Sequence, residues 1–176
     1  MEVTKFGQTF KVKFWDHQKL LGLIALDTET EFITDPSVTP RLVLMTAFDG
    51  KDTAWIITKD RLDDFFDFHS QDNFGFWNAP FDVPVIEQAC SFSFHNALLT
   101  GRCDDGQILY RLLSLATTGN EASFWNLADV TKLYFEEELS KDENIRNRFG
   151  EYIQETENGY IVHYDKIPLE SYQYAA

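Results

Sequence analysis

The chain has 176 residues and a mass of 20.4 kDa, with 44% hydrophobic residues, 15% aromatic residues and a net charge of −14. These values predict one domain with a hydrophobic core, and they exclude a disordered or low-complexity chain. The acidic balance is atypical of proteins that bind duplex DNA, although an enzyme can supply positive charge locally through bound cations.

The sequence carries no signal for a membrane or for secretion. No apolar run approaches the roughly 20 residues of a membrane span, and no basic region followed by an apolar one marks a secretory signal. Cys90 and Cys103 are the two cysteines, and we expect reduced thiols, with one disulfide as the alternative. We expect a cytoplasmic protein that is monomeric and has no membrane contact.

The first half of the chain is rich in strand patterns, which predict strands at 8–15, 21–26, 41–48, 53–58 and 74–77. The first segment alternates, as an edge strand does. The second is apolar throughout, which predicts a strand buried on both faces. Asp49-Gly50 between the third and fourth segments is a hairpin signal.

Amphipathic spacing in the rest of the sequence predicts helices at 60–69, 83–92, 107–115, 124–135 and 141–155. Asp104 and Asp105 are expected to cap the helix from 107, and residues 159–163 read as a short strand or arm. Strands first and helices interleaved later predict an α/β fold, in which helices flank a mixed β-sheet.

Asp27-Thr28-Glu29 directly follows the apolar run 21–26. Period-two geometry places Asp27 and Glu29 on one face of a strand, and two buried carboxylates there need a partner. Their hard oxygen ligands favour Mg²⁺ or Mn²⁺. The alternative interpretation is a solvated strand end that leads into a loop.

A second motif, from Asn78 to Asp82, lies at the end of the predicted strand 74–77. Asn78 can cap the following helix, and Pro80 suits its first turn. Taken alone, the segment is best explained as a strand-to-helix junction whose acid complements the helix dipole. Beside the first motif, however, Asp82 places a third carboxylate at the mouth of an adjacent strand.

The last residues, 171–176, are typical of a C-terminal helix that packs two tyrosines. Together with the earlier motifs they resemble the three exonuclease motifs of the DEDD superfamily of 3′–5′ exonucleases: Leu-Asp-Thr-Glu-Thr at 26–30, Asn-Ala-Pro-Phe-Asp at 78–82 and Tyr-Ala-Ala at 174–176. The tyrosine-bearing branch, with the proofreading domain of family A DNA polymerases, is the nearest likeness. Segments 103–109 and 126–129 are also similar to those domains.

This resemblance implies a ribonuclease H-like fold, in a single domain over 1–176, and hydrolysis of a terminal phosphodiester with two Mg²⁺ or Mn²⁺ ions. By position, Asp27, Glu29 and Asp82 would be the metal ligands, and Asp27 would bridge the two ions. Tyr174 would position the attacking water. We expect the three carboxylates to lie within reach of one cation, with a raised pKa in at least one of them.

The resemblance also implies a substrate, the 3′ end of single-stranded or frayed DNA. Thr28 and Asn78 would contact it beside the metal ligands, and Phe32 or Ile33 would wedge against the terminal base. A polymerase domain or replication proteins are the expected partners. Two alternatives remain open: an RNA-trimming exoribonuclease of the same superfamily, and a catalytically impaired module that docks in a polymerase or replication complex.

The third motif departs from the family pattern. The family has an aspartate four residues after the tyrosine, which corresponds to position 178, and this sequence ends at Ala176. We therefore expect a truncated third motif and an incomplete metal site.

Overall fold

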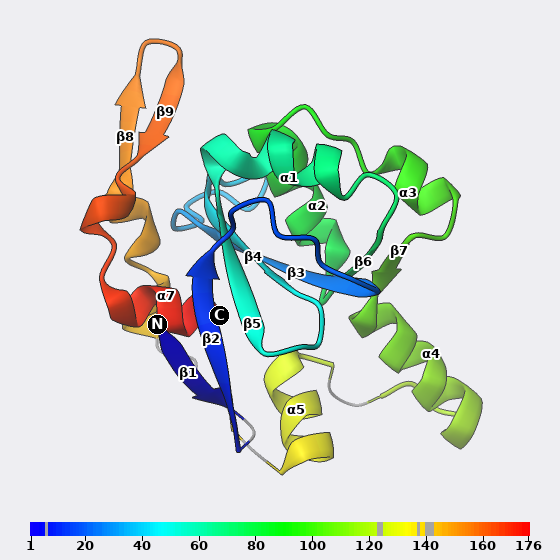
Figure 1. Cartoon of the computed structure of the whole chain (residues 1–176). Coiled ribbons are helices and arrows are strands. Elements are labelled where there is room, and N and C mark those ends of the chain that lie inside the picture. The colour runs from blue at the N-terminus through cyan, green and yellow to red at the C-terminus, as the bar shows by residue number, and fades with distance from the viewer. Residues whose placement is uncertain (6, 123–124, 137, 140–142) are drawn as a thin grey trace.

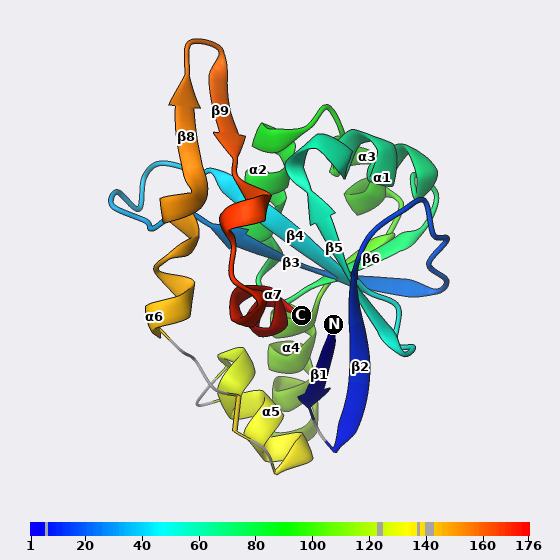
Figure 2. The ribbon, with the colours of Figure 1, turned by 60° about the vertical axis from the view of Figure 1, so that its left-hand side comes forward.

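A computed structural model describes residues 1–5, 7–122, 125–136, 138–139 and 143–176. The described chain forms a mixed seven-stranded sheet in the order β1-β2-β5-β4-β3-β6-β7 (Figure 1). Its strands are β1 (Glu2–Lys5), β2 (Gln8–Phe14), β3 (Leu23–Thr30), β4 (Leu42–Phe48), β5 (Thr53–Thr58), β6 (Asn73–Phe76) and β7 (Cys103–Asp105). A separate hairpin, β8 (Ile153–Thr156) with β9 (Gly159–Val162), projects from the body of the molecule (Figures 1 and 2).

The helices are α1 (Leu62–Phe68), α2 (Ala79–Ala89), α3 (His95–Leu99), α4 (Gly106–Thr118), α5 (Leu127–Phe135), α6 (Glu143–Arg146) and α7 (Leu169–Ala175). Short 3₁₀ turns occupy Lys59–Arg61, Phe149–Tyr152 and Tyr164–Lys166. None of the helices in the described ranges has the length and apolar character that a membrane crossing requires.

Two hydrophobic cores lie on opposite faces of the sheet. The first joins the sheet to α1, α2 and α3 and contains an aromatic cluster that includes Phe65, Phe66 and Phe74. The second joins it to α7 and the 3₁₀ turn at Phe149–Tyr152. Because strand side chains alternate, Ile24 and Leu26 of β3 face the first core, and the residues between them face the second side.

The central strands follow the sequence patterns closely. β4 and β5 pair in antiparallel fashion across Asp49-Gly50, as the turn signal predicts. β3 lies between β4 and β6, antiparallel to the first and parallel to the second. This pairing brings the carboxyl ends of β3 and β6 to the same edge of the sheet, where the two acidic motifs begin.

Several expectations are wrong at the periphery. Residues 8–15 do not form the edge, because β1 pairs outside β2. β3 is not buried on both faces: Leu23 is 51% exposed, and Ala25 and Asp27 on the same side are also exposed. α7 and its neighbours cover only the far end of that face, which leaves the start of the strand in solvent.

The predicted helix at 141–155 is also wrong. Its first two residues lie outside the described ranges, α6 ends at Arg146, and the chain then forms a 3₁₀ turn and β8. Burial of Phe149 and Tyr152 in the second core decides this geometry. Gly150 packs against the loop after β3, where an added Cβ would lie 3.3 Å from the Cα of Glu31.

The other predicted helices have shifted ends, and α3 (His95–Leu99) was not predicted. α2 begins at Ala79, four residues before the expected start, and α5 begins at Leu127. Residue 124, the expected start of α5, lies outside the described ranges. Both cysteines are free thiols, as expected.

Candidate functional site

β3 carries the first acidic motif to the edge of the sheet. Asp27 pairs with Thr46 and Glu29 with Leu44 in the ladder with β4, and Leu44 belongs to the second core. By alternation, Asp27 and Glu29 therefore face the side on which α7 packs, and Thr28 faces α2. Glu29 is only 9% exposed, whereas Asp27 keeps an exposed surface.

The second motif reaches the same edge from the other face of the sheet. Asp82 lies in the first turn of α2 and is 2% exposed. The hydroxyl of Thr28 donates a hydrogen bond to Oδ1 of Asp82 at 2.6 Å. This buried contact joins the two motifs directly, and it fixes the orientation of the Asp82 carboxyl.

The three carboxyl groups influence one another electrostatically. Burial raises the pKa of Glu29 to about 8, and the negative charges of Asp27 and then Asp82 contribute in the same direction. Burial raises the pKa of Asp82 to about 7, with the charge of Asp27 as the next cause. Desolvation likewise raises the pKa of Asp27 despite its exposed surface. The predicted pKa elevation is confirmed, with burial as a larger cause than like-charge crowding.

The donor set suits a hard divalent cation in its chemistry, because it offers carboxylate oxygens whose mutual repulsion an ion would relieve. Its geometry is less complete. Among the described residues, no three His, Cys, Asp or Glu side chains converge as a formed metal site requires. Asp82 approaches from the Thr28 side of β3, and this separates it from the face of Asp27 and Glu29.

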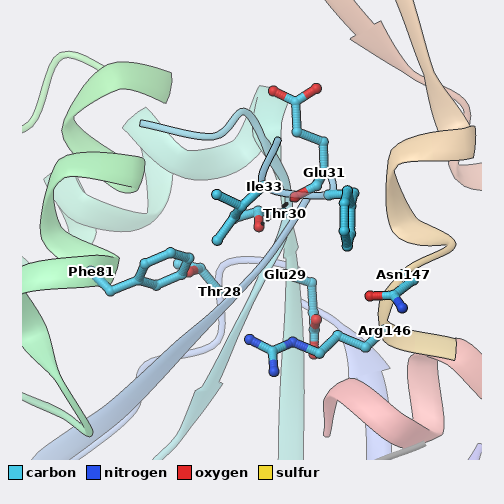
Figure 3. A pocket seen from close by; sticks show the side chains of 9 residues that line it. Thr28, Glu29, Thr30, Glu31, Ile33, Phe81, Arg146 and Asn147 are labelled. Atoms are coloured by element: carbon cyan, nitrogen blue, oxygen red, sulfur yellow. Dashed lines mark hydrogen bonds between the residues drawn. The ribbon is translucent and has the colours of Figure 1, made fainter. Parts of the chain in front are cut away.

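A pocket of about 320 Å³ opens beside these acids (Figure 3). The end of β3 and the loop after it, residues 28–33, form one wall of the pocket. Phe81 of α2 contributes to the lining, as do Arg146 and Asn147 at the end of α6. Phe32 and Ile33, expected as substrate contacts, both line this pocket with exposed side chains.

Arg146 is the feature that sequence reasoning missed. Its side chain extends from α6 toward Glu29 (Figure 3), and its positive charge opposes the elevated pKa values of both Asp27 and Glu29. The sequence places Arg146 inside a predicted helix far along the chain from the acids. No local pattern there indicated a role at the site.

Asn78 occupies the position before α2 in an unexpected way. It adopts a left-handed conformation, with φ of +79°, and its side chain makes no capping hydrogen bond. The carboxylate of Asp105 accepts instead from the backbone N–H of Ala79 at 2.8 Å. The predicted capping by the Asn78 side chain is therefore wrong, and Asn78 is not among the residues that line the pocket.

Asp105 does cap the helix that begins at Gly106, as expected. Its Oδ1 accepts from the N–H groups of Gln107 and Ile108 at 2.8 and 3.1 Å. The same carboxylate thus holds the first turns of both α2 and α4. Of the two adjacent acids expected to cap, the structure selects Asp105.

Tyr174 lies on α7, half-buried against the second core. α7 packs against β3 and α6, so its helix lies on the face that carries Asp27 and Glu29. The amide of Gln173 on the same helix donates to the carbonyl of Glu2 at 2.7 Å. This contact holds the two ends of the described chain side by side (Figure 2).

Several solved nuclease structures have a fold similar to that of this chain. The Nibbler EXO domain from Aedes aegypti superposes with a TM-score of 0.63 at 15% identity, over 88% of this chain and 71% of that one. RNase D from Escherichia coli, an exoribonuclease involved in structured RNA processing, gives 0.55 at 18% identity. The chain spans 35% of the length of RNase D, with 88% of its own length aligned. The fold is that of these exonuclease structures.

NrnC from Brucella melitensis is similar as well. Its complex with pGG gives a TM-score of 0.54 at 16% identity, and its Mg²⁺-bound form gives 0.50 at 14%; both cover 94% of this chain and 73% of NrnC. No protein-family model matches the chain, and no curated protein matches it. The predicted α/β fold of the ribonuclease H-like type is confirmed.

Proposed function

We propose that this protein is a metal-dependent 3′–5′ exonuclease that removes terminal nucleotides from single-stranded nucleic acid. The observation that carries this proposal is the set of acids Asp27, Glu29 and Asp82 with raised pKa values at one edge of the sheet, in a fold similar to those of exonucleases. Buried acids with raised pKa values beside a pocket are typical of a catalytic site.

In this proposal Asp27, Glu29 and Asp82 would hold two Mg²⁺ or Mn²⁺ ions. Such ions would supply Lewis-acid activation of water and would neutralise charge on the phosphate. Thr28 orients Asp82 through its hydroxyl. Because burial raises the pKa of Glu29 to about 8 and that of Asp82 to about 7, binding of a cation near neutral pH should release protons from these groups.

Tyr174 remains the candidate for positioning the attacking water, as the tyrosine-bearing branch of the DEDD superfamily would have it. The packing of α7 on β3 supports this assignment, because it puts the helix on the face of Asp27 and Glu29. Phe32, Ile33 and Phe81 offer apolar surface to a terminal base.

RNA is the substrate that we propose to test first. The sequence resemblance alone favours DNA and a polymerase partner, whereas the similarity to RNase D favours RNA. The second candidate function, a docking module without catalysis, is favoured by the incomplete convergence of metal-ligating side chains in the described residues.

The test is digestion of a 5′-labelled single strand, as RNA and as DNA, with Mg²⁺ or Mn²⁺. We expect stepwise shortening from the 3′ end, no detectable digestion by Asp27→Asn, and slower digestion by Tyr174→Phe with unchanged stabilisation by Mn²⁺ in a thermal melt. Asp67→Asn, an exposed change on α1, is the matched control. Digestion by Asp27→Asn at the wild-type rate would contradict the proposal, and silent wild type that still binds the strand would favour the docking module.

A further inference from the structure

The pocket beside the acids is poor in positive charge. The protein has a net charge of −14, and a nucleic acid brings one negative charge with each phosphate. Among the described residues that line the pocket, Arg146 is the one Lys or Arg side chain. Arg146 is therefore the cationic side chain of this lining that could contact a phosphate directly.

A nearby arginine, Arg41, is already committed to an ion pair. Its Nε and Nη2 donate to Oε2 of Glu31 at 2.9 and 2.7 Å, and its Nη1 donates to Glu155 at 3.3 Å. This network neutralises Glu31 on the pocket wall and fixes the loop that carries Phe32. Arg146, in contrast, forms no ion pair within 4.0 Å with any of the side chains that the structure describes, which do not include that of Glu143.

The backbone around Arg146 is positioned firmly against the pocket. Phe149 is fully buried in the second core, and Gly150 approaches the backbone of Glu31 so closely that a Cβ would meet it at 3.3 Å. These contacts lie a few residues after α6. They fix the end of α6 on the side of the pocket opposite β3. Arg146 itself is exposed and can rotate its long side chain about this fixed base.

The Arg146 side chain extends toward Glu29 at the end of β3 (Figure 3), and both residues line the pocket. If divalent cations bind to Asp27 and Glu29, their positive charge repels the guanidinium of Arg146, which the carboxylates alone would attract. The guanidinium is then available to an anion in the pocket, and its planar fork matches the oxygens of a phosphate.

We propose that Arg146 binds the phosphate of the 3′-terminal nucleotide, in a pocket whose apolar wall of Phe32, Ile33 and Phe81 receives the base. This inference rests on the proposed exonuclease function, since the terminal nucleotide leaves as a nucleoside 5′-monophosphate. The volume of about 320 Å³ suits about one nucleotide. Arg146 is accordingly a substrate-binding residue, outside the group of metal ligands.

The test compares Arg146→Ala and Arg146→Lys with Arg148→Ala. Arg148 is the matched control: it lies two residues further on, is exposed, and pairs with Glu151 outside the pocket. The probes are adenosine 5′-monophosphate and adenosine, titrated by calorimetry with Mg²⁺ present, together with KM and kcat on the labelled RNA strand. Because Arg146 is exposed, all variants should fold, and thermal melts check this.

We expect Arg146→Ala to weaken binding of the 5′-monophosphate by about ten- to a hundredfold, the loss of a charge-assisted hydrogen-bonding group, and to leave binding of adenosine unchanged. Arg146→Lys should recover part of the affinity, and Arg148→Ala should match the wild type. On RNA, Arg146→Ala should raise KM far more than it lowers kcat.

The outcomes separate the two proposals. Wild type that digests RNA, with an unchanged KM in Arg146→Ala, overturns the role of Arg146 and leaves the exonuclease in place. Wild type that binds the 5′-monophosphate through Arg146 and digests nothing supports the binding site and overturns the exonuclease. Equal affinity of the wild type for nucleotide and nucleoside overturns the phosphate site, whatever the activity.

Discussion

The carboxylate of Asp105 caps both α2 and α4, but α2 is packed in the protein core whereas α4 is exposed to solvent. Asp105 accepts hydrogen bonds from the first turns of both. α2 then packs into the first core, where Val85 and Ile86 are fully buried. Its stability therefore comes mainly from tertiary contacts, and the buried face holds Asp82 in place beside Thr28.

No residue of α4 is buried. Its large aliphatic side chains are each 48–57% exposed: Ile108, Leu109, Leu112, Leu113 and Leu115. Helices of this length are marginal in water when nothing packs against them. An amphipathic pattern and a good cap therefore suffice to predict a helix, and they do not reveal whether the apolar face is covered.

The largest expected effect is a difference in the free energy of unfolding between a truncation in α2 and a truncation in α4. Ile86→Ala should lower the free energy of unfolding by about 2–5 kcal/mol, because it leaves a cavity in the first core. Leu112→Ala removes a similar volume from an exposed site and should change that energy by about 0.5 kcal/mol or less. Urea unfolding of both variants, monitored by circular dichroism, measures the difference.

An equally large loss from Leu112→Ala would break the comparison, because it would mean that α4 packs against a partner in solution. Repeating the melt at several protein concentrations would then tell self-association from contacts within the chain.

The second prediction concerns the loss of stability that the buried carboxyl group of Glu29 causes as the pH rises. The folded protein raises the pKa of Glu29 from 4.5 to about 8, so it binds this proton more tightly than the unfolded chain. Stability from this group is complete below pH 4.5 and is lost as the pH rises toward about 8. Glu29→Gln should therefore be about 1–3 kcal/mol more stable than the wild type at pH 8, with little difference at pH 4.

Unfolding curves at several pH values test this sign, and Glu170→Gln, an exposed change on α7, is the control. Mg²⁺ should reduce the difference in the free energy of unfolding between Glu29→Gln and the wild type at pH 8, because it stabilises the wild type selectively. A Glu29→Gln variant that is less stable than wild type at pH 8 would show that Glu29 is held by interactions that outweigh its burial.

The smallest expected effect comes from the shared cap. Asp105→Ala should cost about 1–2 kcal/mol of global stability, because first-turn N–H groups of α2 and α4 lose their acceptor. Amide exchange should accelerate more at Gln107 than at Ala79, since α2 keeps its packing. Asp104→Ala is the neighbouring control, and equal acceleration at both helices would mean that α2 depends on the cap as much as α4 does.

Local signals in the sequence determined much of this protein. The Asp49-Gly50 turn predicted the β4–β5 hairpin, and Asp105 before an apolar pattern predicted the cap of α4. The apolar run before Asp27 correctly predicted a central strand, although β3 continues through both acids to Thr30. Each of these features depends on residues within a few positions of one another, so periodicity and capping preferences are enough to reveal it.

Only the tertiary structure decided the rest. The bond from Thr28 to Asp82, the approach of Arg146 to Glu29 and the exposed side of β3 all depend on segments that are remote in the sequence. The helix predicted after residue 141 gives way because Phe149 and Tyr152 gain more from burial in the second core than from continuing the helical turn. Burial and long-range charge are properties of the assembled fold, and a sequence pattern carries no record of which face a distant segment will cover.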